Sequence, residues 1–171
     1  MAKIGEVLLY ICQNYPHGDE LSKARVTKMV YLADWKAAIE AGHQLTPIQW
    51  KFDHYGPWVD DIVQAARSDD RFRIKRGKTF FGNDKDVIEL APGANGISPE
   101  VTDNDVKILD FVIQVTQKLT WSDFIRLVYS TYPIMSEPRF SSLNLVTLAD
   151  DYRLQQEDIG WVSGPSLLAK A

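Results

Sequence analysis

The stretch of sequence that decides the fold is Val26-Thr27-Lys28-Met29-Val30-Tyr31-Leu32-Ala33-Asp34-Trp35. Apolar residues recur at positions 26, 29, 30, 33 and 37, which is the spacing of one face of an α-helix. Leu32, Trp35 and Ile39 form a second apolar face beside the first. Because a helix that is apolar over so much of its circumference usually lies at the centre of a domain, we expect a buried central helix over residues 21–41.

A short extended segment follows the central helix. Trp50 and Phe52 alternate with polar residues, and this period of two predicts a strand with one buried face. The strand stops at a turn formed by residues 55–57. Since proline suits the first position of a helix, we expect Pro57 to open a new helix that runs to the region of Arg67.

The middle of the chain predicts a β-hairpin. Residues 72–75 and 87–90 have the alternation of strands and enclose a polar turn at residues 82–86. Because two strands alone are marginally stable in water, we expect the segment around Trp50 to supply a third strand, or a helix to support the hairpin. Farther on, Thr102 precedes an acidic residue by three positions, which predicts the capped start of a helix.

Together these segments predict an α+β fold that is mostly α-helical. We expect a single domain with about six helices and a small antiparallel β-sheet or hairpin. Residues 1–135 would form its main part, and residues 136–171 a C-terminal helix and tail packed on the same domain. A chain of 171 residues is long enough to bury one substantial hydrophobic core.

The composition is that of a globular protein with a mildly acidic charge. Apolar residues make up 45% of the chain, and the net charge of −4 disfavours binding to nucleic acid regardless of sequence. Cys12 is the single cysteine, so we expect neither an intramolecular disulfide nor a cysteine metal cluster. No stretch resembles a signal peptide or approaches the length of a membrane span, and we expect a cytoplasmic protein.

Residues of catalytic type are scattered along the chain. The histidines, His17, His43 and His54, occupy loop or boundary positions, and no motif of a metal site, a nucleophile or a phosphate-binding loop occurs. Adjacent carboxylates such as Asp60 and Asp61 point in different directions on a helix and do not serve one site. We therefore expect no enzymatic activity, no catalytic residues, no metal and no cofactor.

The ordered set of motifs from Lys28 to Pro57 resembles a known family. A helix with KMVYLADW, then GxxL, then a WxFxxYGP run is similar to the Panacea domain, the antitoxin domain of the SocA-like group in bacterial and phage toxin–antitoxin pairs. The family often has a histidine in a late helix, where this chain has Tyr129, which marks a divergent member. The motif residues that the resemblance implies to be structural are Lys28, Tyr31, Leu32, Trp35, Trp50, Tyr55, Gly56 and Pro57.

The resemblance implies the function of an antitoxin. Such a protein neutralises a cognate protein toxin, encoded beside it in a bacterium or prophage, by direct protein–protein binding. Some members of the family inhibit the toxin directly, and others deliver it to a protease of the AAA+ class. The apolar end of this chain, residues 166–171, would suit such a protease, although a docked or frayed tail is the more common role of such an end. The sequence does not specify an oligomeric state.

Two groups of residues are candidates for binding the partner. Tyr55 and Trp58 flank the turn and are the aromatic residues that we expect at the surface, where they would anchor an interface. On a strand, Arg71, Arg73 and Lys75 would project from one face and form a positive stripe.

This basic stripe, Arg71–Lys78, has three interpretations. It is the solvated face of an edge strand, where cations discourage unwanted pairing, or it contacts an acidic patch on a protein partner. In the third interpretation it binds nucleic acid, with Phe80 or Phe81 stacking on bases. The third gives the alternative function, a nucleic-acid-associated protein of a phage or mobile element.

Overall fold

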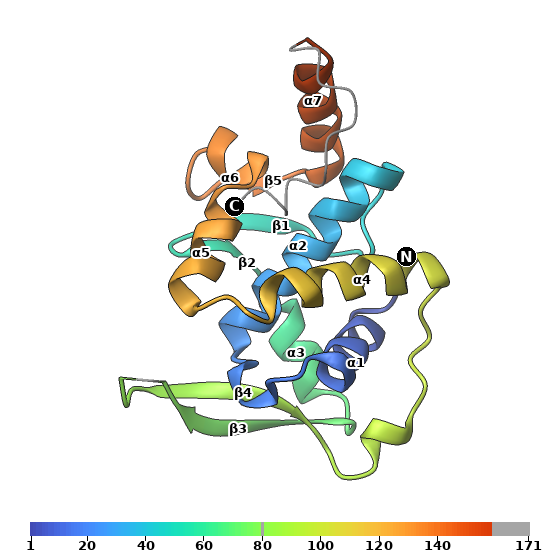
Figure 1. Cartoon of the computed structure of the whole chain (residues 1–171), viewed down its shortest axis with the longest axis vertical. Helices are drawn as coiled ribbons and strands as arrows, with labels where there is room; N and C mark the ends of the chain where they lie inside the picture. Colours follow the sequence, from blue (N-terminus) through green and yellow to red (C-terminus); the bar gives the residue numbers. More distant parts are fainter. Residues whose placement is uncertain (80, 159–171) are drawn as a thin grey trace.

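The computed structural model of the chain describes residues 1–79 and 81–158 and is an α+β fold that is mostly helical (Figure 1). The α-helices of this described part are α1 (Ile4–Asn14), α2 (Lys23–Ala41), α3 (Asp61–Arg67), α4 (Asp103–Thr116), α5 (Trp121–Tyr129), α6 (Tyr132–Ser136) and α7 (Leu145–Asp158). Its strands are β1 (Trp50–Asp53), β2 (Gly56–Trp58), β3 (Phe72–Lys78), β4 (Asp84–Leu90) and β5 (Ser142–Leu143). The predicted fold class is confirmed, with one α-helix more than expected.

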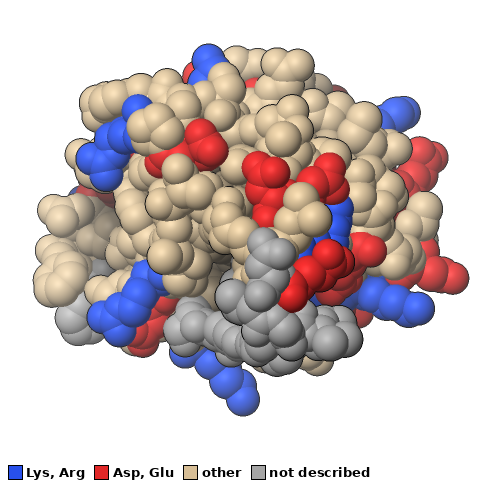
Figure 2. All heavy atoms as spheres, turned by 90° about the horizontal axis from the view of Figure 1, so that it is seen from above, with Lys and Arg blue, Asp and Glu red and all other residues tan. Residues whose placement is uncertain are grey.

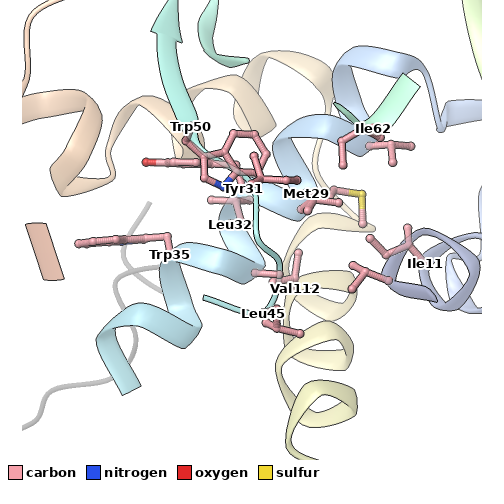
Figure 3. Close-up of a cluster of buried hydrophobic side chains, with 14 of the residues drawn as sticks. Ile11, Met29, Tyr31, Leu32, Trp35, Leu45, Trp50, Ile62 and Val112 are labelled. Atoms are coloured by element: carbon pink, nitrogen blue, oxygen red, sulfur yellow. The ribbon is translucent and has the colours of Figure 1, made fainter. Parts of the chain in front are cut away.

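The central helix α2 is buried along most of its length, as its two apolar faces predict. Every side chain from Arg25 to Ala38 is buried, and the helix contacts α1, α3, α4 and α7. It begins where the Ser22 side chain accepts a hydrogen bond from the Arg25 N–H, and it ends at Gly42, whose φ of 74° is left-handed. Figure 3 shows side chains of α2 meeting those of α1, α3, α4 and β1 in the core.

Strand β1 is the middle strand of a three-stranded antiparallel sheet with the order β2-β1-β5. Trp50 and Phe52 are buried and alternate with more exposed residues, as predicted. The expectation that Pro57 opens a helix is wrong, because Gly56, with a φ of 99°, turns the chain back and Pro57 pairs with Phe52. Proline is tolerated there because β2 is an edge strand, where a missing N–H costs no ladder hydrogen bond.

Strands β3 and β4 form the predicted hairpin, but as a separate two-stranded sheet. The segment around Trp50 does not supply its third strand, because that segment pairs with β2 and β5 instead. The other expectation, support by helices, holds: β4 contacts α1 and α2, and the Ile88 N–H donates a 2.9 Å hydrogen bond to the Leu21 carbonyl. Strand β4 begins inside the expected turn at residues 82–86.

The C-terminal part of the described chain packs on α2. Thr102 caps α4 as predicted, since its hydroxyl accepts a hydrogen bond from the Asp105 N–H and the Asp105 carboxylate accepts one from the Thr102 N–H. The short helix α6 follows α5, and α7 contacts α2, where the rings of Trp35 and Tyr152 meet with centroids 6.0 Å apart. One cluster of buried apolar side chains therefore extends from α1 to α7.

Candidate partner-binding surface

Most residues of the motif from Lys28 to Pro57 are buried, and one side chain, that of Tyr55, is exposed to solvent. The buried members other than Lys28 are Tyr31, Leu32, Trp35, Trp50, Gly56 and Pro57. Tyr55, in the turn between β1 and β2, is 83% exposed, in agreement with its predicted position at the surface. The motif therefore builds the core and holds Tyr55 in solvent.

Two further aromatic rings continue from Tyr55, because His54 adjoins Tyr55 and Phe140 adjoins His54. The ring centroids of His54 and Tyr55 are 6.4 Å apart, and those of His54 and Phe140 are 4.9 Å apart with the rings at 74°. Phe140 belongs to the loop between α6 and β5 and is 66% exposed. We call these three residues, His54, Tyr55 and Phe140, the aromatic surface.

Phe140 has an unfavourable backbone conformation. Its φ of 73° is left-handed, and within residues 1–79 and 81–158 it is the one residue other than glycine with a positive φ. Its N–H donates a 2.6 Å hydrogen bond to the Phe52 carbonyl, and the Phe52 N–H donates a 2.9 Å hydrogen bond to the Ser141 carbonyl. Strain of this kind costs about 1–3 kcal/mol and clusters at functional sites. The sheet therefore holds an aromatic side chain in solvent at a cost to stability.

Phe140 is not among the partner-binding residues that the sequence predicts. The strained φ depends on hydrogen bonds to β1, which is far away in the chain, and nothing in the neighbouring residues indicates it. One local feature does indicate an exposed aromatic side chain at this position. The phenylalanine lies inside the polar segment Glu137-Pro138-Arg139-Phe140-Ser141, where a buried side chain is not expected.

Lys28 of α2 is a buried cation beside β2. Its side chain is 2% exposed, and its Nζ lies 5.6 Å from the centroid of the Trp58 ring, which is a cation–π contact. Within the described residues the Lys28 ammonium has no hydrogen bond and no ion pair. Burial therefore lowers the pKa of Lys28 to about 8.

Gly56 and Trp58 adjoin Lys28, Tyr129 adjoins Gly56, and we call these four residues the Lys28 cluster. A Cβ at position 56 would lie 3.3 Å from the Tyr129 ring and 3.7 Å from the Lys28 Cε, so a side chain there would crowd both. Trp58, predicted to be exposed, is half-buried, and its indole N–H donates a 3.2 Å hydrogen bond to Asp60. The Lys28 cluster thus joins α2, β2 and α5 at the edge of the sheet.

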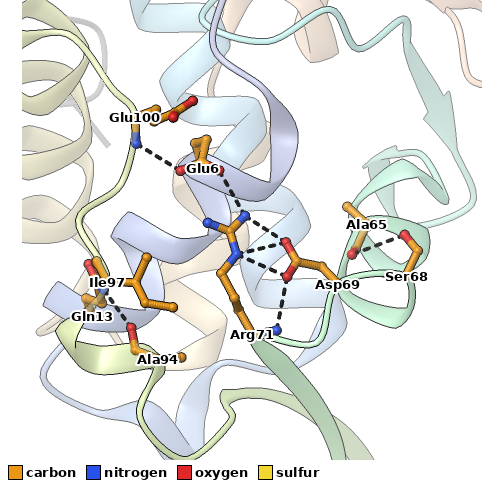
Figure 4. A network of polar contacts seen from close by, with 9 residues as sticks. All are labelled: Glu6, Gln13, Ala65, Ser68, Asp69, Arg71, Ala94, Ile97 and Glu100. Carbon is orange, nitrogen blue, oxygen red and sulfur yellow. Dashed lines mark hydrogen bonds and ion pairs between the residues drawn. The ribbon is translucent and has the colours of Figure 1, made fainter.

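Arg71 does not belong to an open positive stripe. It precedes β3, and its guanidinium binds Glu6 of α1 at 2.9 Å and Asp69 at 2.7 Å (Figure 4). Hydrogen bonds from Arg71 lower the pKa of both carboxyl groups. Arg71 therefore ties α1 to the start of the hairpin, and the expectation that its charge forms a positive stripe with those of Arg73 and Lys75 is wrong for Arg71, which two carboxylates pair.

Exposed cations farther along β3 form ion pairs with acidic residues of the neighbouring strand β4. Arg76 lies 3.5 Å from an Asp84 oxygen and 3.3 Å from an Asp86 oxygen, and Lys78 also pairs with Asp84. At the opposite end of the molecule, Figure 2 shows positive and negative side chains interspersed over a largely uncharged surface. Neither region, in the part of the chain that the structure describes, offers the continuous positive surface that is typical of nucleic-acid binding.

Phe80, one of the two rings expected to stack on bases, and residues 166–171, expected to suit a protease, lie outside the described residues, whereas the other ring, Phe81, is 87% exposed. In residues 1–79 and 81–158, no three side chains of His, Cys, Asp or Glu converge as metal ligands would. No helix in the same ranges is both long and apolar enough to cross a membrane. Burial raises the pKa of the Cys12 thiol to about 12, which disfavours the thiolate form at neutral pH.

A family model described as antitoxin SocA-like, Panacea domain, matches residues 26–133. No curated protein and no solved structure matches the chain. The matched segment begins in α2 and ends in α6, so it contains the whole Lys28 cluster and the β1–β2 turn with Tyr55. Phe140 lies beyond the matched segment, although its ring completes the aromatic surface.

Proposed function

The chain belongs to the family of SocA-like antitoxins with a Panacea domain, and we propose from this premise that it neutralises a cognate protein toxin by binding it directly. In this proposal the chain performs no chemical step and is not an enzyme. It acts as a rigid scaffold whose surface occupies the toxin, with shape and apolar contact supplying affinity. The partner is a protein encoded beside this chain.

The observation that carries the proposal is the aromatic surface. Tyr55 and Phe140 are both strongly exposed, while the backbone that holds them is hydrogen-bonded into the sheet β2-β1-β5. Aromatic side chains that are fixed before binding lose little conformational entropy and are enriched among the residues that dominate interface energies. We therefore assign Tyr55 and Phe140 as the anchors, with His54 between them. Arg73 and Lys75 stay predicted contacts of the rim.

Binding to nucleic acid through the basic stripe is the weaker alternative. Arg71 is engaged by Glu6 and Asp69, and Arg76 and Lys78 face acidic residues of β4. A salt titration separates the two functions. Phosphate contacts predict an affinity for nucleic acid that falls steeply with added salt, whereas toxin binding through an aromatic surface changes little.

The proposed function is tested by producing the protein from the adjacent reading frame alone and together with this chain. We expect growth to stop when the neighbour is produced alone and to resume when both are produced. The toxin level in the rescued cells distinguishes the two antitoxin mechanisms, because direct occupation leaves the amount of toxin unchanged and delivery to a protease lowers it. Failure of the wild-type chain to restore growth would refute the proposal.

A further inference from the structure

Among the buried charged side chains of the described chain, Lys28 is the one whose charged group has no hydrogen-bond or ion-pair partner. Glu6 binds Arg71, Lys36 pairs with Glu40, and Asp34 accepts hydrogen bonds from Thr46 and Trp50. Arg25 donates a 3.0 Å hydrogen bond to the Leu119 carbonyl and lies 3.5 Å from Glu20. Lys28 is as deeply buried as Arg25, at 2% exposed, yet none of the described residues offers its ammonium an acceptor.

Packing alone does not explain a lysine at this position. A buried ammonium without an acceptor opposes folding, and the ring of Trp58 recovers only part of the lost hydration. A methionine of similar length would fill the same space between α2 and β2 without that cost. The packing of the free chain therefore does not account for a charge at position 28.

The Lys28 ammonium is not completely sealed from solvent. The fully buried side-chain atoms that lack a hydrogen-bond partner in the described chain are Arg25 Nε, Thr27 Oγ1 and Trp35 Nε1. Lys28 Nζ also lacks a partner but is not one of these atoms, so it retains contact with solvent. The side chain is thus almost wholly buried, with a small contact between its Nζ and solvent, beside the half-buried ring of Trp58.

We propose that the Lys28 ammonium receives one carboxylate of the bound toxin and forms with it the salt bridge that the free chain lacks. This inference rests on the proposed function and names a chemical feature of the partner. Position supports it, because Gly56, which adjoins the Lys28 stem, directly follows Tyr55 of the aromatic surface. A protein that covers Tyr55 therefore brings its own side chains to the edge of β2.

The surroundings favour a single carboxylate over a phosphate. Lys28 is one cation, and Trp58 also lines a surface hollow of about 600 Å³ together with Lys51 and the more numerous acidic residues Asp53, Asp60 and Asp61. These acidic residues repel a doubly charged phosphate or a nucleic-acid backbone more strongly than a carboxylate with one charge. The salt bridge would form within an interface from which water is excluded, where removal of one charged partner strongly lowers the binding affinity.

The test compares the wild-type chain with Lys28→Met and, as a matched control, Lys51→Met. Lys51 is an exposed lysine of β1 directly opposite Trp58, so its loss removes the same charge without touching the buried ammonium. We expect Lys28→Met to bind the purified product of the adjacent reading frame about ten- to a hundredfold more weakly and Lys51→Met to bind it like the wild type. Equal affinities of wild type and Lys28→Met would overturn the inference and leave the proposed function intact.

A second measurement reads the charge itself and does not depend on folding of a variant. The Nζ and Cε resonances of Lys28, followed by NMR in labelled chain, report its titration with and without the toxin. We expect the pKa of Lys28 to rise on binding, because a carboxylate stabilises the ammonium. Tyr129 of α5 lies beside the same glycine as the Lys28 stem, so the measurement is repeated in Tyr129→Phe. A pKa of Lys28 that is unchanged or lower in the complex would contradict the proposal.

The source of the carboxylate is distinguished in the toxin. A toxin extended at its C-terminus by a short neutral tag moves its terminal carboxylate away, whereas replacement of its acidic side chains by amides removes those one at a time. The affinity difference between the wild-type chain and Lys28→Met is measured with each toxin variant. The toxin variant that abolishes this difference identifies the carboxylate that binds Lys28. Retention of the difference with every toxin variant would overturn the inference. If the wild-type chain binds no product of the adjacent frame, the inference and the proposed function fall together.

Discussion

Single residues differ in whether a buried charge finds a partner. Asp34 of α2 is fully buried, and its carboxylate accepts hydrogen bonds from the Thr46 N–H, the Thr46 hydroxyl and the Trp50 indole at 2.9, 2.6 and 2.8 Å. Lys28, on the same helix, has no acceptor. The first arrangement joins α2 to the segment that leads into β1, whereas the second leaves the free chain with an uncompensated charge.

Replacing Lys28 with methionine should stabilise the free chain at pH 7. Folding lowers the pKa of Lys28 from 10.5 to about 8, so the charged form costs up to about 3 kcal/mol. Between these two values the native chain binds fewer protons than the unfolded chain, and the wild type gains stability as the pH rises. The advantage of Lys28→Met should therefore shrink above pH 8. Urea denaturation of both proteins at pH 7 and pH 10 measures the difference, in which the titration of the tyrosines cancels.

A stability difference that is the same at both pH values would show that Lys28 carries no buried charge in the free chain. Lys51→Met serves again as the control, because an exposed lysine should change stability by less than about 0.5 kcal/mol at either pH.

Replacing Phe140 with glycine should raise the stability of the free chain by about 1 kcal/mol. Glycine adopts the φ of 73° without steric cost, and the exposed phenylalanine ring gives up little buried area. Phe140→Ala keeps the strain and should not show the same gain. Thermal unfolding of the two variants measures the difference, and a lower midpoint for Phe140→Gly than for Phe140→Ala would refute the assignment of strain.

At the residue scale, sequence alone predicted the exposure of Tyr55 and the burial of Trp35 and Trp50. These outcomes follow from local periodicity and from the position of Tyr55 in a turn. The isolation of Lys28 and the strain at Phe140 could not be predicted, because each depends on groups brought together from distant parts of the chain.

At the scale of secondary-structure elements, Arg71 carries the contact between α1 and the hairpin. Arg71→Met should lower stability by about 1–3 kcal/mol at pH 7, because the carboxylates of Glu6 and Asp69 lose their cation in a partly buried place. The folded pKa values of both acids are lowered, so the stabilisation is present above their unfolded values and disappears as the pH falls through the folded ones. The wild type and Arg71→Met should thus converge in acid.

Denaturation at pH 7 and at about pH 3, well into the range where such carboxylates become protonated, measures this convergence. Arg73→Met is the matched control, since Arg73 is exposed on β3 and should change stability by less than about 0.5 kcal/mol. An equal loss for Arg71→Met and Arg73→Met would mean that the network with Glu6 and Asp69 does not stabilise the fold.

The elements with strong local signals were predicted, and those that depend on distant pairing were not. The buried helix α2 and the capping box at Thr102 follow from spacing in the chain. Strand β5 has only two residues, and its pairing of Ser142 with Lys51 has no local pattern. At Pro57 the local preference for a helix start was overruled by pairing with Phe52 across β1.

At the scale of the whole molecule, one core holds together the segments that carry the proposed binding residues. Strand β1 pairs with β2 and β5, so the turn that contains Tyr55 and the loop that contains Phe140 are fixed to the same strand. Helix α2, with Lys28, contacts β2 directly. A surface fixed in this way is ordered before the toxin arrives, which reduces the entropy lost on binding.

Whether the aromatic surface holds the toxin is measured by the affinity of the purified toxin for the double variant Tyr55→Ala/Phe140→Gly, determined by calorimetry beside the wild type. Leu154→Ala, which removes an exposed apolar side chain of α7, is the control. We predict that the double variant is at least as stable as the wild type but binds about a hundredfold or more weakly, while Leu154→Ala binds normally. An affinity of the folded double variant equal to that of the wild type would contradict the claim that the aromatic surface holds the toxin.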